Sequence, residues 1–162
     1  MSPQPFDRRN GWTLYQHPAF REQIDALVAD VEQLAKTLPR EDFLHHAKAR
    51  FLARVQKIVL EDVPTDPASK MHELGNTLGA DRRYWRRAKF NQRFRIFFRF
   101  HSKARLLIYA WMNDEHSLRA RGARNDVYAE FERRLKSGNP PDDWEQLLAQ
   151  LNQCRAGHRK IV

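Results

Sequence analysis

The sequence predicts an α+β fold, in which an N-terminal helical hairpin packs on a small, mainly antiparallel twisted sheet and C-terminal helices follow. Three observations predict it. Residues 84–113 alternate between apolar and basic side chains with a period of two, which is typical of half-buried strands. Residues 17–62 carry apolar side chains at helical spacing. Two shorter helical patterns follow the strands, over 126–136 and from residue 140 onward.

The N-terminal part is predicted to form one strand and two helices. Residues 11–16, GWTLYQ, are a strand candidate that adds to the sheet. The pair His17-Pro18 starts the first helix, since proline is favoured in a first turn, and Pro39 ends it. A second helix is predicted over about residues 40–62. The apolar stripes of this hairpin are expected to cover one sheet face: Phe20, Ile24, Leu27, Val28, Val31, Leu34 and Leu38, then Leu44, Ala47, Phe51, Val55, Ile58 and Val59.

Three short strands joined by tight turns are predicted within residues 84–113. They follow a loop over 64–83, rich in Pro, Gly, Ser and Asn, with a helical turn near Met71 and a position that suits the wall of a cleft. The third strand, 106–112, is apolar on both faces and is expected in the sheet interior. The middle strand places Phe94, Ile96, Phe98 and Phe100 on one face, and Arg93, Arg95, Phe97 and Arg99 on the other.

Positive charge is concentrated in these strands. Between residues 81 and 105 the only acid is Asp81, and the segment carries about +9, which equals the formal net charge of the whole chain. Cations on a solvated sheet face attract polyanions such as RNA. The simpler alternative is a soluble sheet whose Arg and Lys side chains stand in water. The basic residues are 82, 83, 86, 87, 89, 93, 95, 99, 103 and 105.

The segment after the strands allows two interpretations. Asn113-Asp114-Glu115 is typical of a helix start, but an acid here could also orient an arginine or accept a proton. In particular, Asp114 could tether Arg119 beside the sheet. A helix is then predicted over 126–136, ending at Gly138, and a last helix opens after Pro140-Pro141.

Length and composition limit the class of protein. A chain of 162 residues is expected to form one domain, 1–162, with flexible ends at 1–10 and 155–162. The single cysteine, Cys154, excludes an intrachain disulfide and fits a reducing compartment. No run reaches the length of a membrane span, and the N-terminus has no secretory signal, so we expect a cytoplasmic protein. The pI near 10.1 favours an acidic partner, either nucleic acid or an acidic protein that masks the basic face.

No motif for a metal or cofactor is present. None of the seven histidines has a standard ligand spacing, CxxC is absent, and residues 75–79 lack the Lys-Ser/Thr of a phosphate-binding loop. The basic strands suggest a reaction that needs neither. In RNA, the 2′-hydroxyl can attack the neighbouring phosphate, and arginine stabilises the charge that develops there. Lys89 could transfer a proton if the surrounding arginines lower its pKa. Bases could stack on Trp85, Tyr109 or Trp111, although core packing is the alternative for each aromatic residue.

Three stretches of the sequence closely resemble the YhaV family of toxins, within the RelE-like group of type II toxin–antitoxin systems. They are NGWTLYQHPAF at 10–20, WRRAKFNQRFRIFFRF at 85–100 and AWMNDEHSLRARGARNDVYAEFERRLKSGNPPDDWEQL at 110–147. The resemblance covers about residues 10–150. It implies a RelE-like fold and a ribonuclease that cleaves mRNA in association with ribosomes and arrests growth. It also implies an AbrB-like antitoxin, and a toxin–antitoxin complex that represses its own operon and reaches operator DNA only through the antitoxin.

Site residues follow from the basic face together with this resemblance. The candidate catalytic residues are Arg87, Lys89, Arg95 and Arg119. Arg87 and Arg95 are expected to stabilise charge, and Lys89 to transfer a proton or bind phosphate. Tyr128 is open to two roles, stacking or acid–base chemistry, besides a place in the core. Substrate binding is assigned to Arg86, Arg93, Arg99, Trp111 and Asn113.

Two other classes of function compete with a metal-independent endoribonuclease. A non-catalytic basic protein could bind RNA or ribosomes and block translation by occupancy, and it would leave RNA uncut. A sequence-specific DNA-binding domain is less well supported, because the sequence shows no helix-turn-helix and its positive charge lies on strands.

Overall fold

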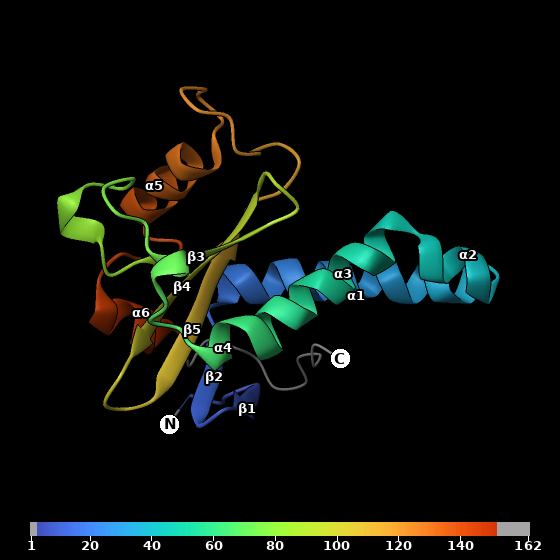
Figure 1. Cartoon of the computed structure of the whole chain (residues 1–162), viewed down its shortest axis with the longest axis horizontal. Coiled ribbons are helices and arrows are strands. Elements are labelled where there is room, and N and C mark those ends of the chain that lie inside the picture. Colours follow the sequence, from blue (N-terminus) through green and yellow to red (C-terminus); the bar gives the residue numbers. More distant parts are fainter. Residues whose placement is uncertain (1–2, 152–162) are drawn as a thin grey trace.

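The computed structural model describes residues 3–151 and has a five-stranded mixed sheet at its centre (Figure 1). The strands are β1 (Asp7–Arg9), β2 (Trp12–Gln16), β3 (Arg86–Phe90), β4 (Phe94–His101) and β5 (Leu106–Met112). Their order is β1-β2-β5-β4-β3. The β2–β5 pair is parallel and the other pairs are antiparallel. The α+β class and the position of β5 inside the sheet are therefore confirmed.

The N-terminal strand prediction is also confirmed, with one addition. Residues 12–16 pair with β5, as expected for a strand that extends the sheet. Asp7–Arg9, which we expected in a flexible N-terminal segment, instead forms the edge strand β1. The turn between β1 and β2 uses Asn10 and Gly11, both with positive φ, so a two-residue connection closes this hairpin. The expected flexible segment at 155–162 and Cys154 lie outside the described residues.

The helical hairpin packs on one face of the sheet and projects beyond its edge (Figure 1). Its first helix is α1 (Pro18–Thr37), capped by His17, whose Nδ1 accepts a hydrogen bond from Ala19 N at 3.0 Å. The second helix is not continuous, contrary to our expectation. It consists of α2 (Arg40–His45), α3 (Ala47–Lys57), a π-helical turn η1 (Ile58–Asp62) and α4 (Val63–Thr65). The break falls at His46, whose extended backbone and ring nitrogen cap α3.

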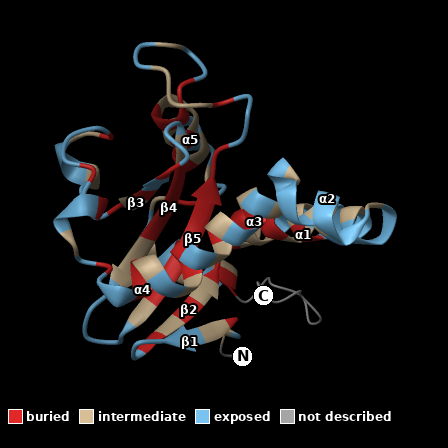
Figure 2. Cartoon of the chain, turned by 45° about the vertical axis from the view of Figure 1, so that its right-hand side comes forward, coloured by how far each residue is buried: buried red, intermediate tan, exposed pale blue. Residues whose placement is uncertain are grey.

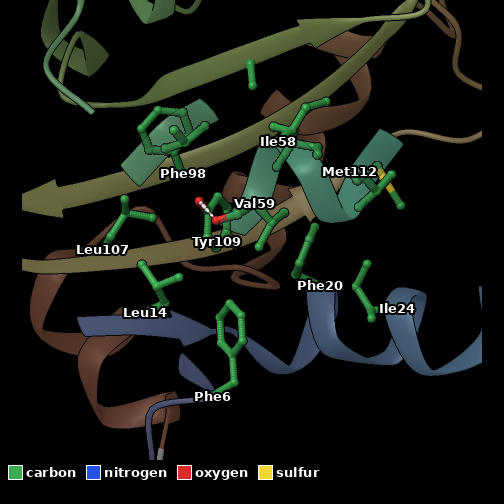
Figure 3. Packing of buried hydrophobic residues seen from close by; sticks show 14 of the residues in the cluster. Phe6, Leu14, Phe20, Ile24, Ile58, Val59, Phe98, Leu107, Tyr109 and Met112 are labelled. Carbon is green, nitrogen blue, oxygen red and sulfur yellow. Dashed lines mark hydrogen bonds between the residues drawn. The ribbon is translucent and has the colours of Figure 1, made fainter. Parts of the chain in front are cut away.

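The hairpin and the sheet enclose the first hydrophobic core (Figure 3). The predicted face of β4 contributes to it, with Ile96 and Phe98 fully buried. The hydroxyl of Tyr109 donates a hydrogen bond to Val59 O at 2.7 Å, which joins β5 to the π-helical turn. Toward the hairpin tip the predicted stripe is no longer covered, and Leu44 is 52% exposed.

The other sheet face carries a second core, which contradicts the expected solvated basic face (Figure 2). The helix α5 (Val127–Ser137) covers this face. Phe97 is fully buried and stacks on Phe131 of α5, with the ring centroids 4.0 Å apart. A bulge in the β4–β5 pairing turns both Ala110 and Trp111 toward this core. Aromatic side chains between the arginines thus supply enough apolar surface to bind a helix.

The predicted helix start at residue 113 is wrong. Asn113 is buried and its amide donates to the carbonyls of Arg93, at 3.1 Å, and Ser117, at 2.9 Å. Its Oδ1 accepts from Arg95 N at 2.8 Å. These bonds hold the chain in a loop over residues 113–126, since the polar side chain binds strand and loop backbone rather than the amides of a helical turn.

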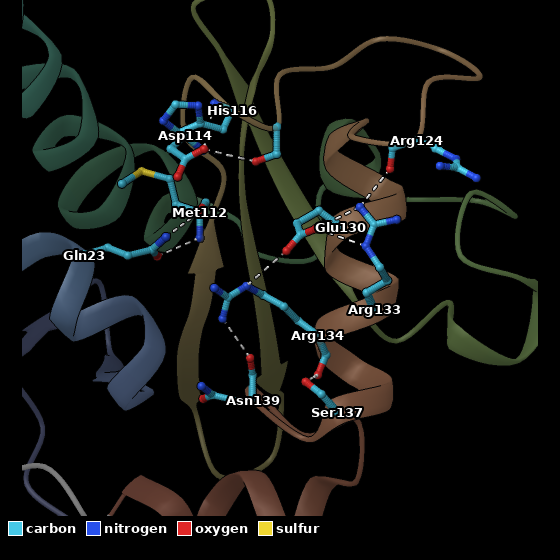
Figure 4. Close-up of polar contacts among 11 residues, drawn as sticks. Gln23, Met112, Asp114, His116, Arg124, Glu130, Arg133, Arg134, Ser137 and Asn139 are labelled. Carbon is cyan, nitrogen blue, oxygen red and sulfur yellow. Dashed lines mark hydrogen bonds and ion pairs between the residues drawn. The ribbon is translucent and has the colours of Figure 1, made fainter.

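The helix predicted over 126–136 begins and ends within one residue of its predicted bounds, whereas the last helix begins at Trp144 rather than directly after Pro141. Asp126 caps α5, and Gly138 ends it in the left-handed conformation. The last helix is α6 (Trp144–Gln150), capped by Asp143. Hydrogen bonds to backbone carbonyls hold α5 to its surroundings (Figure 4), because Arg134 donates to Asn139 O at 3.1 Å and Arg133 to Arg124 O at 2.8 Å. The loop over 64–83 contains the turn near Met71, η2 (Lys70–His72), and a second one, η3 (Ala80–Arg82).

Candidate functional site

Four cationic side chains converge beside the β3–β4 turn, on the face of the sheet that α5 covers. Lys89 and Arg95 are paired across the two strands, Arg87 lies two residues before Lys89, and Arg119 comes from the 113–126 loop. Lys89 is exposed. Its pKa is lowered, chiefly by the charge of Arg87, and further by burial and by the charges of Arg95 and Arg119. We call these four residues the cationic cluster. They are the four residues that were predicted from the sequence to be catalytic.

Arg95 is held rigidly below this cluster. It is only 7% exposed, so the expectation of a solvated arginine is wrong at this position. Its Nε donates to the hydroxyl of Tyr128 at 3.1 Å. Its Nη1 donates to the carbonyls of Gln92, at 2.9 Å, and Phe94, at 2.8 Å. The guanidinium therefore joins the β3–β4 turn to α5, and its charge has a fixed place.

Arg119 is oriented by Asp126. The sequence had suggested Asp114 as its partner, and that suggestion is wrong. Arg119 Nη1 donates to Asp126 Oδ1 at 2.8 Å, and its guanidinium carbon lies 4.8 Å from the ring centroid of Tyr128. Asp114 instead accepts from His116 N at 2.8 Å in its own turn. The loop that carries Arg119 is tied to the sheet at Arg93, whose Nε donates to Arg119 O at 2.9 Å.

Burial alone would raise the pKa of Asp126. The hydrogen bond from Arg119 and those from the backbone amides of Ala120 and Tyr128 outweigh it, so the pKa of Asp126 is lowered. The carboxyl group is thus ionised at neutral pH. It pairs with Arg119 and also caps the start of α5. We had predicted Asp126 only as the start of a helix. Nothing in the local sequence showed that Arg119 would be its partner.

Arg87 forms the outer side of the cluster. Its Nη1 donates to Glu73 O in the segment before β3, while its Nε is buried without a partner among the described residues. His72, the residue before Glu73, is buried against Phe98 and lies close enough to Arg87 to be affected by its charge. Burial lowers the pKa of His72, so it remains neutral and adds no charge to the cluster. The loop over 64–83 thereby supports Arg87 through the backbone of Glu73.

The residues assigned to substrate binding are dispersed. Arg93 is exposed next to the cluster. Asn113 is buried and holds the loop, as described above. Arg86 lies on the opposite face of β3, where it pairs with Glu73 at 3.4 Å. Trp111 is 3% exposed, and its ring stacks on Phe131 with a centroid distance of 5.7 Å.

The candidate stacking residues are also mostly core residues. Trp85 and Tyr109 are fully buried and Trp111 is nearly so, and none of the three presents a free ring face. Arg99 is partly buried among aromatic rings at the far end of β4, and its Nη1 donates to Asp142 O at 2.8 Å. Among the described residues, the exposed aromatic side chain is Tyr84, at 40%, which lies next to Arg99.

Across residues 3–151, no group of three or more His, Cys, Asp or Glu side chains is placed to share a metal ion. None of the helices in this part of the chain is long and apolar enough to cross a membrane. The cationic cluster places three arginines around one lysine of lowered pKa, which suits an anionic substrate and proton transfer.

The chain matches over residues 14–152 a family model described as a toxin with endonuclease activity, of a toxin–antitoxin system. The chain belongs to the YhaV toxin family. Three curated YhaV relatives are each 42% identical to it over 148 residues, which is 90% of this chain and 96% of each relative. They are Toxin YhaV from Escherichia coli O6:H1, Ribonuclease toxin YhaV from strain K12 and Toxin YhaV from O157:H7. No solved structure is significantly similar to the chain.

Membership of the YhaV family confirms the resemblance seen in the sequence. The protein is a toxin with endonuclease activity and part of a toxin–antitoxin system, which implies an antitoxin as its partner. The YhaV match spans all of the cationic cluster as well as Tyr128 and Asp126.

Proposed function

We propose that this toxin is a metal-independent endoribonuclease, an mRNA interferase, whose active site is the cationic cluster. The observation that carries the proposal is the convergence of Arg87, Arg95 and Arg119 around Lys89, whose pKa is lowered. The name of the K12 relative, a ribonuclease toxin, supports RNA as the substrate. The cations can neutralise phosphate charge by themselves, so the proposed reaction needs no metal ion.

In the proposed reaction, the 2′-oxygen of RNA attacks the adjacent phosphorus. Lys89, in its neutral form, accepts the proton of the 2′-hydroxyl as the new O–P bond forms. The bond between phosphorus and the 5′-oxygen breaks, and that oxygen takes up a proton as it leaves. The products are a 2′,3′-cyclic phosphate and a 5′-hydroxyl end. Alignment of the 2′-hydroxyl with the leaving oxygen accounts for a large part of the acceleration.

The three arginines have different roles in the proposed reaction, because they differ in how far each is buried. Arg119 is partly exposed, with 24% of its side chain accessible, and it binds the phosphate oxygens as negative charge develops. Arg87 adds charge at the outer side and lowers the pKa of Lys89. Arg95 is buried and bonded to the protein, so it acts through its fixed positive field and by holding Tyr128.

The wider biology of the family completes the proposal. We propose a RelE-like fold, since a helical hairpin on a mainly antiparallel sheet agrees with that group. In the cytoplasm the toxin would associate with ribosomes, cleave mRNA and inhibit translation and growth. An AbrB-like antitoxin would neutralise it, and the complex would repress the operon. The formal net charge of +9 supports both an RNA substrate and an acidic segment in the antitoxin.

The test is cleavage of end-labelled mRNA in EDTA, with and without ribosomes. We would compare the wild type with Arg87→Ala, Lys89→Gln and the double variant Arg87→Ala, Arg95→Ala. Arg50→Ala is the matched control, since it removes one exposed positive charge from α3 in the hairpin on the opposite face. We expect cutting by the wild type and the control, with cyclic phosphate ends, and strong losses in the cluster variants.

Three results would contradict the proposal. Equal cutting by all proteins would place the active site elsewhere or show a contaminating nuclease. Tight binding to RNA or ribosomes without any cut product would favour the alternative in which the protein blocks translation by occupancy. Cleavage that is lost in EDTA and restored by Mg²⁺ would replace the metal-independent reaction with a metal-dependent one.

A further inference from the structure

A pocket lies on the same face of the sheet as the cationic cluster, toward the other end of β4. Its volume is about 560 Å³, within the range of small-molecule sites. We call it the Tyr84–Trp144 pocket. It is lined by Tyr84 and Arg99 of the sheet region, by the end of α5 and by the start of α6, including Lys136, Asp142, Asp143, Trp144 and Gln146. No residue of the proposed active site lines it.

Three planar side chains lie together at this pocket. The guanidinium carbon of Arg99 lies 4.0 Å from the ring centroid of Tyr84 and 4.9 Å from that of Trp144. The ring of His101 stacks on Trp144, with centroids 6.1 Å apart and planes inclined by 26°. Tyr84 is 40% exposed and Trp144 is partly exposed, so the pocket presents aromatic surface that the core does not cover. Stacking on such rings is the usual way in which proteins hold unpaired bases.

The pocket is preformed, because Asp142 holds its members in place. The hydroxyl of Tyr84 donates to Asp142 Oδ2 at 2.7 Å, and the indole N–H of Trp85 donates to Oδ1 at 2.8 Å. The backbone carbonyl of the same residue accepts from Arg99. Burial, together with Asp142, raises the pKa of Tyr84 to about 12, so its ring remains neutral. A rigid aromatic surface loses little conformational entropy when a ligand binds.

The distance between pocket and cluster suits one strand of RNA. Arg95, Phe97 and Arg99 alternate on the same face of β4, and Arg95 belongs to the cluster while Arg99 belongs to the pocket. Four residues of a strand span about 13 Å. Because α5 covers Phe97 between Arg95 and Arg99, the RNA strand would run along β3, the edge strand that carries Lys89, and its reacting phosphate at Lys89 would lie a few nucleotides from the pocket.

We propose that the Tyr84–Trp144 pocket is a subsite that stacks one unpaired base of the RNA strand, a few nucleotides from the cleaved bond. This rests on the proposed ribonuclease function and extends it to substrate selection. The lining favours a base over a phosphate, because Asp142 and Asp143 offset the charges of Arg99 and Lys136, and Asp143 can accept hydrogen bonds from base amino groups. Lys136 at the rim is exposed and can pair with the flanking phosphate.

The experiment is a scan with abasic nucleotides. The probe is a short fluorescein-labelled single-stranded RNA taken from around a mapped cleavage site, with 2′-deoxyribose at the attacked position so that it is not cut. Each member of the series lacks the base at one position. Affinity is measured by anisotropy for the wild type, Tyr84→Ala, Tyr84→Leu and Tyr84→Phe. The leucine variant keeps apolar volume without an aromatic face, and the phenylalanine variant keeps the ring.

For the wild type we expect about tenfold weaker binding when one particular base away from the cleaved bond is missing. Tyr84→Ala and Tyr84→Leu should bind the intact RNA about tenfold more weakly and lose that positional effect, whereas Tyr84→Phe should retain it. An identical positional profile in the wild type and the leucine variant would overturn the subsite. If the unmodified RNA is cut by none of the proteins, the ribonuclease proposal fails instead, so the two failures are distinguishable.

Discussion

Arg119 and Asp126 form an ion pair of 2.8 Å that joins the loop after β5 to the first turn of α5. The same carboxylate accepts hydrogen bonds from Ala120 N, at 2.7 Å, and Tyr128 N, at 3.1 Å. One buried acid therefore sets the positions of a candidate catalytic arginine and of the tyrosine that binds Arg95. Function and stability are linked at this point, because the group that orients Arg119 also caps the helix.

Substitution of Asp126 should separate these two roles. Asn caps helices about as well as Asp, so Asp126→Asn should keep α5 but release Arg119, with cleavage reduced on the order of 10- to 100-fold. Asp126→Ala should also destabilise the protein by about 1–2 kcal/mol, because the cap is lost. Chemical denaturation and cleavage rates measure the two effects. Full activity in a folded Asp126→Asn protein would show that Arg119 needs no orientation.

The stability that Asp126 provides should depend on pH. Its pKa is lower in the folded protein than the ordinary value of 3.8, so the ionised carboxylate stabilises the fold above that value. This contribution is lost as the pH falls through the lowered pKa. The free energies of unfolding of the wild type and Asp126→Asn should therefore differ at neutral pH and approach each other in strong acid. A constant difference from neutral to acidic pH would contradict this assignment.

The cleavage rate should rise with pH as Lys89 loses its proton. Its pKa is below the ordinary value of 10.5, and Arg87 is the largest cause. Arg87→Ala should therefore move the plateau of kcat/KM to higher pH, besides lowering the rate. Arg50→Ala, the matched control, should leave both the cleavage rate and the pH of the plateau unchanged. Rates are corrected for spontaneous RNA hydrolysis, which is measured in parallel reactions without protein. An unshifted pH profile in Arg87→Ala would show that Lys89, with a pKa lowered by Arg87, is not the base.

Removal of the Tyr128 hydroxyl should loosen Arg95. Tyr128→Phe keeps the ring against Phe97 and Arg119 but leaves Arg95 Nε without its partner at 3.1 Å. Because a buried donor loses its acceptor, we expect about 1–2 kcal/mol of destabilisation and a lower cleavage rate. Urea denaturation and kcat/KM measure the two effects. An unchanged pH profile would assign the hydroxyl to positioning, and a lost limb of the profile would assign it to proton transfer.

The second core should be required for both folding and activity. Phe131 is fully buried and stacks on Phe97 and Trp111, so Phe131→Ala should cost about 3–5 kcal/mol. Cleavage should fall with it, because α5 carries Tyr128. Leu44→Ala at the exposed hairpin tip is the apolar control and should change stability by no more than about 0.5 kcal/mol. Thermal unfolding provides the comparison, and similar losses in both variants would contradict the second core.

Local patterns predicted most of the fold correctly. The alternation along β4, the apolar third strand and the helical stripe of α1 are each set by a period of the backbone. The cap at Asp126 and the stop at Gly138 depend on residues next to each other in the sequence. One error arose where distant residues decide, because Asn113 resembles a helix cap but binds the backbone of β4. The other was local, since His46 caps α3 through Lys48 and thereby breaks the second helix of the hairpin.

The four residues of the cationic cluster were predicted from sequence and do lie together. Their environment was not predicted. The sequence indicated a row of solvated arginines, whereas α5 covers this face and buries Arg95 and Trp111. Phe97 was a signal, since an aromatic residue among arginines in one row gives a helix an apolar surface to bind. The pairing of Arg119 with Asp126 had no such signal.

The sequence by itself determined the fold class, the order of the elements, the excess of positive charge and the family, because each depends on composition, on short periods or on the similarity of aligned residues. The tertiary structure decided which cations are free to meet a substrate and which are bonded to the protein. It also brought Tyr84 and Trp144, far apart in the chain, around Arg99. Burial and pairing are set by contacts between distant segments, and no local pattern in the chain encodes them.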